Sequence, residues 1–384
     1  MKPLNSIVAA CPPSGIRRFF DIAANMDSVI SLGVGEPDFT TPWNVREAAI
    51  YAFEHGYTNY TSNAGLIELR EAVCLDLERR CGASYQPDGE CLITSGVSQG
   101  LDIALRALLD AGDEVIIPEP CYVAYGPCVS FAGGVPVLVP SADSAFQVDV
   151  DAIEAAVTER TKAILVASPA NPTGAVQTID SLTALVELAV RHDLYIVSDE
   201  IYEQLVYGVP HVSVPSLPGA RDRTVLLGGF SKAYAMTGWR VGYLCAPAEI
   251  VELAGRIHQY TMLCAPHVSQ LAALEALRGG REEVTEMVVD YDRRRRFFVK
   301  GLNDLGLSCE EPHGAFYAFP SVASTGLSSD EFAERLLVEQ RVAVVPGHVF
   351  GPSGEGHVRC CYATALPLIE EALERMDRFL STLR

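Results

Sequence analysis

Short apolar runs alternate with segments of helical periodicity in the middle of the chain, and this alternation constrains the fold more than any other feature. Continuous apolar runs are typical of strands buried on both faces of a mostly parallel sheet, and helices carry the chain from one such strand to the next. The sequence therefore predicts an α/β fold whose large doubly wound domain has a mostly parallel, seven-stranded sheet. The predicted strands are 90–94, 114–117, 135–139, 163–167, 194–198, 224–227 and 241–245, with helices at about 98–109, 149–157 and 180–191.

The pattern changes after about residue 250, which indicates a second, smaller α+β domain. Residues 252–260 and 268–299 are predicted to be largely helical, and strands within 314–320, 342–346 and 357–362 are predicted to belong to the smaller unit. The first 45 residues are rich in proline and glycine and are expected to wrap back onto this unit. We assign 48–285 to the large domain, and 1–47 with 286–384 to the small domain and its N-terminal arm.

The balance of charge excludes one large class of partners. The chain carries 49 acidic and 29 basic side chains, a formal net charge of −20, whereas nucleic acids are bound by basic surfaces. The arginine run 293–296 is interpreted as a solvated helix face. We therefore expect small-molecule ligands and no nucleic acid.

The cysteine pattern indicates a reducing compartment. The chain has 11 cysteines, an odd number, and lacks a Cys-x-x-Cys pair, which is typical of buried free thiols. No histidine spacing predicts a metal site. No apolar stretch approaches the roughly 20 residues that span a membrane, and the apolar part of the N-terminus is too short for a signal peptide. We expect a cytoplasmic protein with no membrane contact and no metal.

Polar, aromatic and charged residues follow the ends of the predicted strands. In open α/β sheets, ligands bind beyond the carboxyl ends of the strands, so these residues are the candidates for a shared site. They are Gly96, Val97, Ser98, Tyr122, Asn171, Asp199, Tyr202, Ser231, Lys232 and, just ahead of the last strand, Arg240.

Lys232 carries the strongest chemical signal of this set. A lysine that follows a buried strand is costly unless it has a function, and burial lowers its pKa and frees the amine for carbonyl chemistry. Arg240 lies eight positions later and suggests an anionic group on the ligand. The turn from Gly96 to Ser98 opens a helix, whose N–H groups would hold a phosphate together with Arg240.

The remaining candidates fit an aromatic ring. Tyr122 would stack on the ring, and Asp199 would keep a ring nitrogen protonated. Asn171 and Tyr202 would donate hydrogen bonds to a ring oxygen. Lys232 would form a Schiff base with an aldehyde on the same ring. A phosphorylated aromatic aldehyde with these features is pyridoxal 5′-phosphate.

Three motifs give a specific resemblance. Asn171-Pro-Thr-Gly, Asp199-Glu-Ile-Tyr and Ser231-Lys-x7-Arg240-x-Gly resemble the signature of the class I/II aminotransferases of pyridoxal-phosphate fold type I. The resemblance covers essentially the whole chain, from 13–19 and 31–39 through the segment around Tyr60 to 314–317 and 357–359, and is greatest to the broad aspartate/aromatic subgroup.

The resemblance implies roles at the matching positions. Lys232 is then the Schiff-base lysine and the general base, and Asp199 the partner of the ring nitrogen. Asn171 and Tyr202 contact the ring oxygen, and Tyr122 stacks. The phosphate is held by the other candidates of the set, which are Gly96, Val97, Ser98, Ser231 and Arg240. Lys232, Asp199 and Tyr202 are the expected catalytic residues.

The resemblance also implies a substrate site and a partner. Arg359 would bind the substrate α-carboxylate, assisted by Asn171 and the backbone of Gly35. Tyr60 would reach the phosphate of the neighbouring subunit, which implies a homodimer with shared sites. Phe19, Phe39 and Tyr317 are expected to line the pocket for the substrate side chain.

Two departures from the family pattern bear on function. Gly229 stands where some members have a serine that binds the phosphate, and no second arginine for a side-chain carboxylate is evident. We expect an aminotransferase that uses aspartate or an aromatic amino acid as donor and 2-oxoglutarate as acceptor, by a ping-pong mechanism. Its first steps are shared by carbon–sulfur β-lyases and aminocyclopropane carboxylate synthases, which remain the alternative. A cofactor-sensing transcription regulator is disfavoured by the acidic charge.

Overall fold

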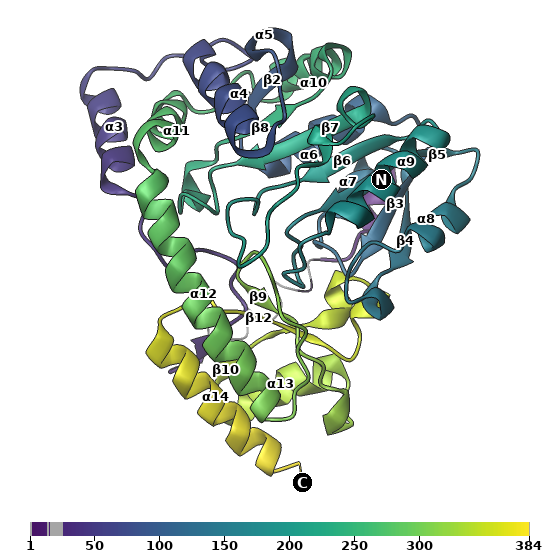
Figure 1. Ribbon diagram of the computed structural model, residues 1–384, viewed down its shortest axis with the longest axis vertical. Coiled ribbons are helices and arrows are strands. Elements are labelled where there is room, and N and C mark those ends of the chain that lie inside the picture. Colours follow the sequence, from purple (N-terminus) through teal and green to yellow (C-terminus); the bar gives the residue numbers. More distant parts are fainter. Residues whose placement is uncertain (1, 14, 16–25, 384) are drawn as a thin grey trace.

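Seven strands form one sheet at the centre of the larger part of the molecule (Figure 1). The structure is a computed structural model that describes residues 2–13, 15 and 26–383. The strand order is β2-β8-β7-β6-β5-β3-β4, and β8 alone runs antiparallel to its neighbours. The strands are β2 (Cys91–Thr94), β3 (Glu114–Glu119), β4 (Val135–Pro140), β5 (Thr161–Ala167), β6 (Tyr195–Asp199), β7 (Thr224–Gly229) and β8 (Gly242–Cys245). The predicted mostly parallel seven-stranded sheet is confirmed, with bounds shifted by up to two residues.

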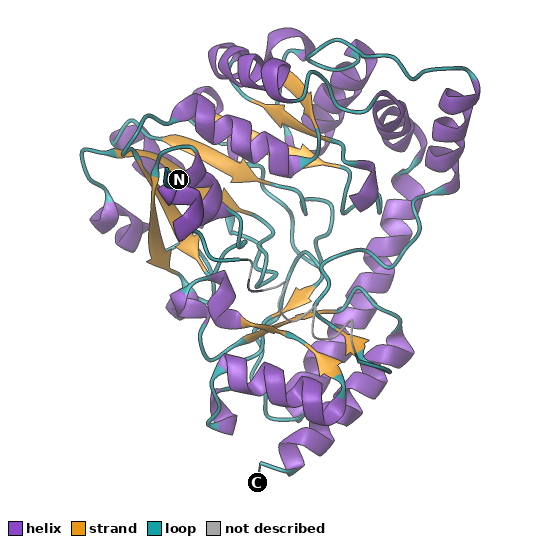
Figure 2. Cartoon of the chain, turned by 180° about the vertical axis from the view of Figure 1, so that it is seen from behind, coloured by secondary structure: helices purple, strands orange, loops and turns teal. Residues whose placement is uncertain are grey.

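Helices cover both faces of this sheet (Figure 2). Successive residues of a buried strand point to opposite faces, so Val115 and Ile117 pack into one apolar cluster and Ile116 into another. The first face is covered by α6 (Val97–Leu108), α7 (Tyr125–Phe131) and α10 (Ala248–Thr261). The second is covered by α4 (Ile67–Cys81), α8 (Val150–Ala156), α9 (Ile179–Arg191) and α11 (His267–Gly279). Helix α3 (Trp43–Glu54) packs on α11, and the short α5 (Pro87–Glu90) on α4.

The smaller part contains the five remaining strands. Strands β11 (Val345–Pro346), β12 (Val358–Cys361) and β9 (Tyr317–Ala318) form an antiparallel sheet in that order, and β1 (Ile30–Ser31) pairs in parallel with β10 (Val342–Ala343). Helices α13 (Ser329–Gln340) and α14 (Leu366–Ser381) pack beside them. The long helix α12 (Arg281–Asp304) runs from the larger part to the smaller one (Figure 1).

The N-terminal segment contacts both parts of the molecule. Its strand β1 joins β10 of the smaller part, as the predicted return of this segment requires. Its first helix, α1 (Ser6–Ala10), instead packs against α7 of the larger part. The predicted stretch 13–19, including Phe19, lies largely outside the described residues.

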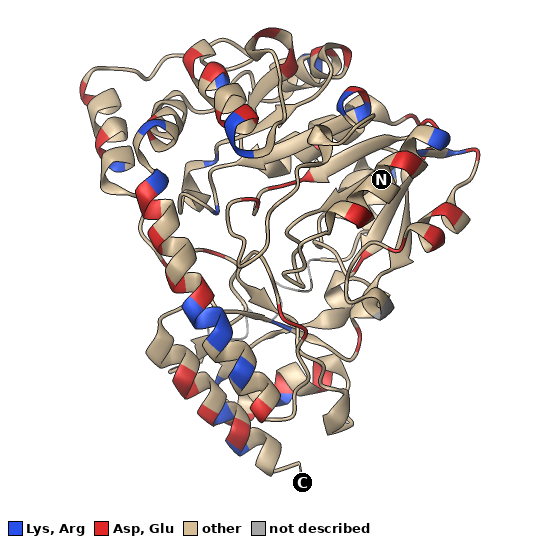
Figure 3. Ribbon diagram, viewed as in Figure 1, with Lys and Arg blue, Asp and Glu red and all other residues tan. Residues whose placement is uncertain are grey.

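The arginine run on α12 is not the solvated face that its charge suggested. Arg293 and Arg296 are exposed, but Arg294 and Arg295 are buried. Arg294 binds Asp38 and Asp290, and Arg295 binds Asp292 and Glu311. In Figure 3, blue and red stretches of ribbon follow one another along α12, as basic and acidic residues alternate in its sequence. Two of the four arginines therefore connect the helix to neighbouring segments, because acidic partners from distant parts of the chain reach them.

All 11 cysteines are free thiols. Within the described ranges, no helix is both long enough and apolar enough to cross a membrane. The same residues contain no cluster of three or more histidine, cysteine or carboxylate side chains suited to a metal ion.

Candidate active site

The candidate residues converge on one pocket at the carboxyl ends of the parallel strands. The pocket has a volume of about 370 Å³. It lies between the sheet on one side and, on the other, residues 34–36 together with Tyr317 and Arg359 of the smaller part. Its lining includes twelve of the residues singled out by sequence, namely Gly35, Val97, Ser98, Tyr122, Asn171, Asp199, Tyr202, Ser231, Lys232, Arg240, Tyr317 and Arg359. Residues separated by more than 300 positions in the chain thus line one cavity.

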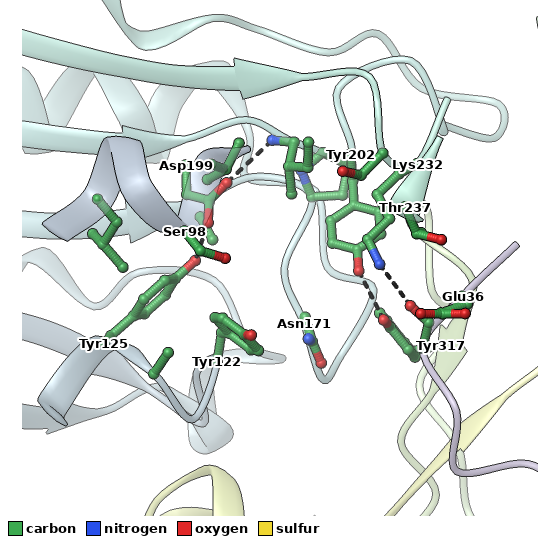
Figure 4. Close-up of a pocket in the computed structure, with 18 of the residues that line it drawn as sticks. Glu36, Ser98, Tyr122, Tyr125, Asn171, Asp199, Tyr202, Lys232, Thr237 and Tyr317 are labelled. Atoms are coloured by element: carbon green, nitrogen blue, oxygen red, sulfur yellow. Dashed lines mark hydrogen bonds between the residues drawn. The ribbon is translucent and has the colours of Figure 1, made fainter. Parts of the chain in front are cut away.

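Lys232 lies in the turn that follows β7, and its amine points into the pocket (Figure 4). Nζ donates a hydrogen bond of 2.6 Å to the carbonyl oxygen of Gly35. Burial lowers the pKa of Lys232 to about 8, and the positive charges of Arg359 and Arg240 act in the same direction. About a tenth of this amine is therefore neutral at pH 7, and only the neutral amine can act as a nucleophile or general base.

Asp199 ends β6 on the other side of the pocket (Figure 4). Its Oδ2 accepts a hydrogen bond of 2.7 Å from the hydroxyl of Tyr125, and Oδ1 accepts one of 3.2 Å from the N–H of Ile201. Burial raises the pKa of Asp199, and these two hydrogen bonds oppose the rise. The result is a fixed, buried carboxylate that is suited to bind a cationic partner from the pocket.

An anion site lies at the N-terminus of α6. Gly96 precedes this helix with φ +78°, a conformation that side chains other than glycine rarely adopt. A Cβ atom on Gly96 would lie 2.6 Å from Nη2 of Arg240, so the guanidinium lies directly over this turn. The N–H groups of the first helical turn point outward from a helix of 12 residues, and their partial positive charge adds to that of Arg240. Ser98, Ser231 and Thr237 also line this part of the pocket.

Arg359 of β12 lines the pocket, and its contacts hold its guanidinium in one position. The residue is 2% exposed, and its guanidinium lies between the rings of Tyr317 and Phe350, at 4.5 and 4.9 Å from their centroids. Nη1 donates to Oδ1 of Asn171 at 2.9 Å, and Nη2 donates to the oxygen of Gly33 at 2.6 Å. Its Nε is buried and has no hydrogen-bond partner among the described residues. This arginine is therefore fixed in place with donor capacity to spare.

Tyr202 and Tyr317 form a hydrogen-bonded pair on the same side as Lys232 (Figure 4). Their hydroxyl oxygens are 2.7 Å apart. Burial raises the pKa of Tyr202 and that of Tyr317, so both phenols remain protonated at neutral pH. Gly35 packs against Tyr317 so closely that a Cβ atom would overlap the tyrosine hydroxyl. The pair thus connects the large-domain loop after β6 to the segment around Gly35.

Besides Gly96, which lies against Arg240 without lining the pocket itself, three predicted residues lie outside this pocket or cannot be placed in it. Tyr60 is 80% exposed, so it is not a core residue, and it does not line the pocket of its own chain. Phe39 was expected to line the substrate pocket, but this is wrong: it lines a different hollow beside α3 and packs edge-on against Tyr291. Phe19 lies outside the described residues.

Sequence reasoning missed several pocket residues, and three of them make polar contacts or carry charge. Tyr125 binds Asp199 from one turn beyond Tyr122, which is visible only once α7 is placed. Thr237 accepts a hydrogen bond from Arg240 Nη1 through its backbone oxygen, at 2.8 Å, and it also lines the pocket. Glu36 lines the pocket next to Gly35.

Gly229, the departure from the family pattern, lies where β7 meets β8. A Cβ atom at this position would lie 3.1 Å from the Cα atom of Gly242 on the neighbouring strand. The close approach of the two backbones leaves little room for a side chain here. Glycine at this position therefore lets β7 and β8 pack closely where a serine would place a hydroxyl group.

Comparison with known proteins gives consistent relatives over the whole chain. Residues 27–376 match the family model described as aminotransferase class I and II. A putative aminotransferase of Bacillus subtilis, YugH, is 56% identical, with 98% of both chains covered. An aspartate aminotransferase of Pyrococcus abyssi is 46% identical, with 96% of both chains covered. The crystal structure of an aromatic aminotransferase from Pyrococcus horikoshii superposes with a TM-score of 0.91 at 44% identity, covering 96% of this chain and 99% of that one.

Proposed function

The chain belongs to the class I and II aminotransferases, and from this premise we propose a role for each residue of the pocket. The family depends on pyridoxal phosphate, and the protein is a pyridoxal-phosphate-dependent aminotransferase of fold type I. The family membership and the fold leave open which side chain performs which step and which substrates are used. The arrangement of the pocket supports the following assignments.

The donor set of the pocket fits the cofactor. An anion cradle at Arg240 and the adjoining Gly96, a buried carboxylate at Asp199 and the amine of the half-buried Lys232 lie around one cavity. These groups match the phosphate, the ring nitrogen and the aldehyde of pyridoxal phosphate, respectively. Tyr122 lines the cavity beside Asp199, where it would stack on the ring, and Tyr202 with Asn171 would hold the ring oxygen (Figure 4).

The bound cofactor supplies an aldehyde for the substrate amine and an aromatic ring that withdraws electrons from the substrate Cα. Asp199 holds a proton on the ring nitrogen, and the hydroxyl of Tyr125 keeps the carboxylate in place and ionised. Lys232, whose pKa is lowered to about 8, would take the proton from the substrate Cα and would deliver it to the cofactor carbon that is bonded to the same nitrogen. Tyr202 contributes a hydrogen bond that fixes the ring oxygen.

Arg359 would hold the α-carboxylate of the substrate. Its fork has N–H groups beyond those that bind Asn171 and Gly33, and these fit one carboxylate in a bidentate arrangement. Asn171 already accepts a bond from Arg359 and so is placed to donate from its amide nitrogen to the same carboxylate. This contact fixes the substrate so that its Cα–H bond faces Lys232.

Aspartate or an aromatic amino acid is the proposed donor, with 2-oxoglutarate as acceptor in a ping-pong cycle. The names of the relatives support this choice, because they include aspartate and aromatic aminotransferases at similar identity. The rings of Tyr122 and Tyr317 in the lining are suited to an aromatic side chain. Among the described lining residues, the cations are Lys232, Arg240 and Arg359. Each of them has a proposed role other than binding a carboxylate on the substrate side chain.

A homodimer with shared sites is proposed as the active form. Large apolar side chains are exposed together on α3 and in the segments next to it, among them Trp43, Phe53, Tyr57 and Tyr60. The Tyr57 ring lies near that of His267, which joins this segment to the start of α11. Burial of such a surface in a second copy would bring Tyr60 to the neighbouring phosphate site. The free cysteines support a cytoplasmic location.

The single observation that carries the proposal is the shared cavity of Lys232, Asp199 and Arg359. Its test is a panel of amino acids added singly to the cofactor-loaded enzyme, while the absorbance of the cofactor bound to Lys232 is followed. Loss of that band with aspartate or aromatic amino acids, and its return on adding 2-oxoglutarate, is the expected result. Release of ammonia and pyruvate from cystathionine, with no oxo-acid acceptor added, would instead indicate the lyase reaction.

A further inference from the structure

Glu200 follows Asp199 directly and lies behind the proposed cofactor site. Its side chain is buried, with 2% of the residue exposed. The carboxylate accepts three hydrogen bonds, from Ser198 Oγ at 2.8 Å, from the N–H of Val214 at 3.0 Å and from Nε2 of His211 at 2.9 Å. A buried carboxylate with this many donors is held in one position. It does not line the pocket, so the proposed mechanism gives it no role.

His211 lies in a strongly charged but closed environment. Its side chain is 7% exposed, and Nδ1 has no hydrogen-bond partner among the described residues. The ionisable groups around it are Glu200, Glu203 and, from α4, Arg80, whose own partners are Glu203 and Asp76. Arg281 of α12 binds Asp76 on the outer side.

The charges of this cluster do not balance without the histidine. Three carboxylates, on Asp76, Glu200 and Glu203, face two guanidinium groups, which leaves one negative charge. A protonated imidazole at His211 would neutralise it. Burial acts to lower the pKa of His211, but the hydrogen bond and charge of Glu200 and the charge of Glu203 more than offset this, and the pKa lies above its ordinary value.

The state of this cluster bears on Asp199. Burial is the main cause that raises the pKa of Asp199, and the charge of Glu200 raises it further. A carboxylate next to another carboxylate takes up a proton more readily unless a cation compensates the second charge.

We propose that His211 is a positioning residue whose imidazolium neutralises Glu200, so that Asp199 on the pocket side remains ionised for the cofactor ring nitrogen. This inference rests on the proposed role of Asp199 and adds a pair of residues behind it. The hydrogen bond from His211 to Glu200 also fixes the end of β6. The charge of the imidazolium, however, is what keeps Asp199 ionised in this proposal.

The first test uses the affinity of the cofactor-free protein for pyridoxal phosphate between pH 4.5 and 8, measured by equilibrium titration. Affinity should fall as Asp199 takes up a proton at low pH. In His211→Gln, which keeps an N–H donor and removes the charge, this fall should move upward by about one pH unit. The double variant E200Q/H211Q, which removes both charges, should return the fall to its wild-type position.

Two controls separate charge from structure. Ser198→Ala removes another hydrogen bond to Glu200 without changing charge and should leave the pH profile in place. His192→Gln breaks a comparable but surface-exposed pair, His192 with Glu154, and should also leave it in place. If H211Q leaves the profile unchanged, or if S198A shifts it as much, the inference is overturned.

A second test needs no cofactor. A histidine whose pKa is raised on folding stabilises the folded state fully below its unfolded pKa, near 6.5, and this stabilisation is lost as pH rises through the folded value. The stability difference between wild type and H211Q should therefore be largest near pH 6 and shrink toward pH 9. A difference that is constant over this range would contradict a charged His211.

A further variant, Asp199→Asn, distinguishes a failure of the proposed role of Asp199 from a failure of the inference about His211. Asp199→Asn should weaken cofactor binding and abolish its dependence on acid pH. If D199N binds as wild type does, the role of Asp199 fails, whatever His211 does. If D199N behaves as expected and H211Q does not, the inference alone fails.

Discussion

Replacement of Arg359 by lysine tests how the substrate carboxylate is held. Lysine keeps one positive charge but loses the planar fork and its packing between Tyr317 and Phe350. In the native protein, Arg359 already donates to Asn171 and Gly33, and its buried Nε–H has no partner among the described residues. A substrate carboxylate would bind the N–H groups of the fork that these two contacts leave free.

The expected loss follows from the number of bonds. One charge-assisted hydrogen bond contributes about 1.5–3 kcal/mol, and replacing a bidentate contact by a point charge removes about one such bond. We therefore expect kcat/KM for the amino donor to fall about 100-fold in Arg359→Lys, since ~1.4 kcal/mol corresponds to a factor of ten.

The assay is the half-reaction of the cofactor-loaded enzyme with a single donor, followed by stopped-flow absorbance. Cofactor content should remain complete, because Arg359 does not contact the phosphate cradle in this account. Arg335→Lys is a matched control, since Arg335 lies over the Phe379 ring at 5.4 Å in a distant helix. A change in kcat/KM of less than threefold in Arg359→Lys would refute the assignment of the carboxylate to this residue.

Three further predictions concern the cofactor site and the dimer. Because the pKa of Lys232 is about 8, about a tenth of its amine is neutral at pH 7, and the rate of cofactor uptake by the cofactor-free protein should rise about tenfold to a plateau above pH 9; a flat rate would contradict a lowered pKa. Gly96→Ala and Gly89→Ala both place a side chain at positive φ, and each should cost about 1–2 kcal/mol of stability. Only Gly96→Ala crowds Arg240, so only this variant should bind the cofactor more weakly than wild type. Equal cofactor affinities in the two variants would refute the phosphate site at Gly96 and Arg240. Hybrid dimers of Lys232→Ala and Tyr60→Ala subunits should be more active than either parent, because one site in each hybrid is intact; no gain over the parents would exclude a shared site at Tyr60.

The sheet and most of the pocket could be predicted because local patterns encode them. Short apolar runs, several of them continuous, predicted all seven strands of the main sheet. The rule that ligands bind at the carboxyl ends of parallel strands brought Asn171, Asp199 and Lys232 together. The placement of Arg359 and Gly35 relied on family resemblance, since no local pattern joins residues 324 positions apart.

What could not be predicted depends on contacts between distant segments. The burial of Arg294 and Arg295 results from acidic partners at Asp38 and Glu311, and a run of charge alone favours a solvated face. Tyr125 could not be assigned to Asp199 before the position of α7 was known. Phe39 was misplaced for the same reason, because its neighbours on α12 lie about 250 residues away in sequence.

The covalent attachment of the cofactor tests the central claim most directly. Borohydride reduction of the cofactor-loaded protein, followed by proteolysis and mass spectrometry, identifies the lysine that carries pyridoxal phosphate. The account predicts that the label lies on the peptide that contains Lys232. Label on the surface residues Lys162 or Lys300 instead, with none on Lys232, would contradict it.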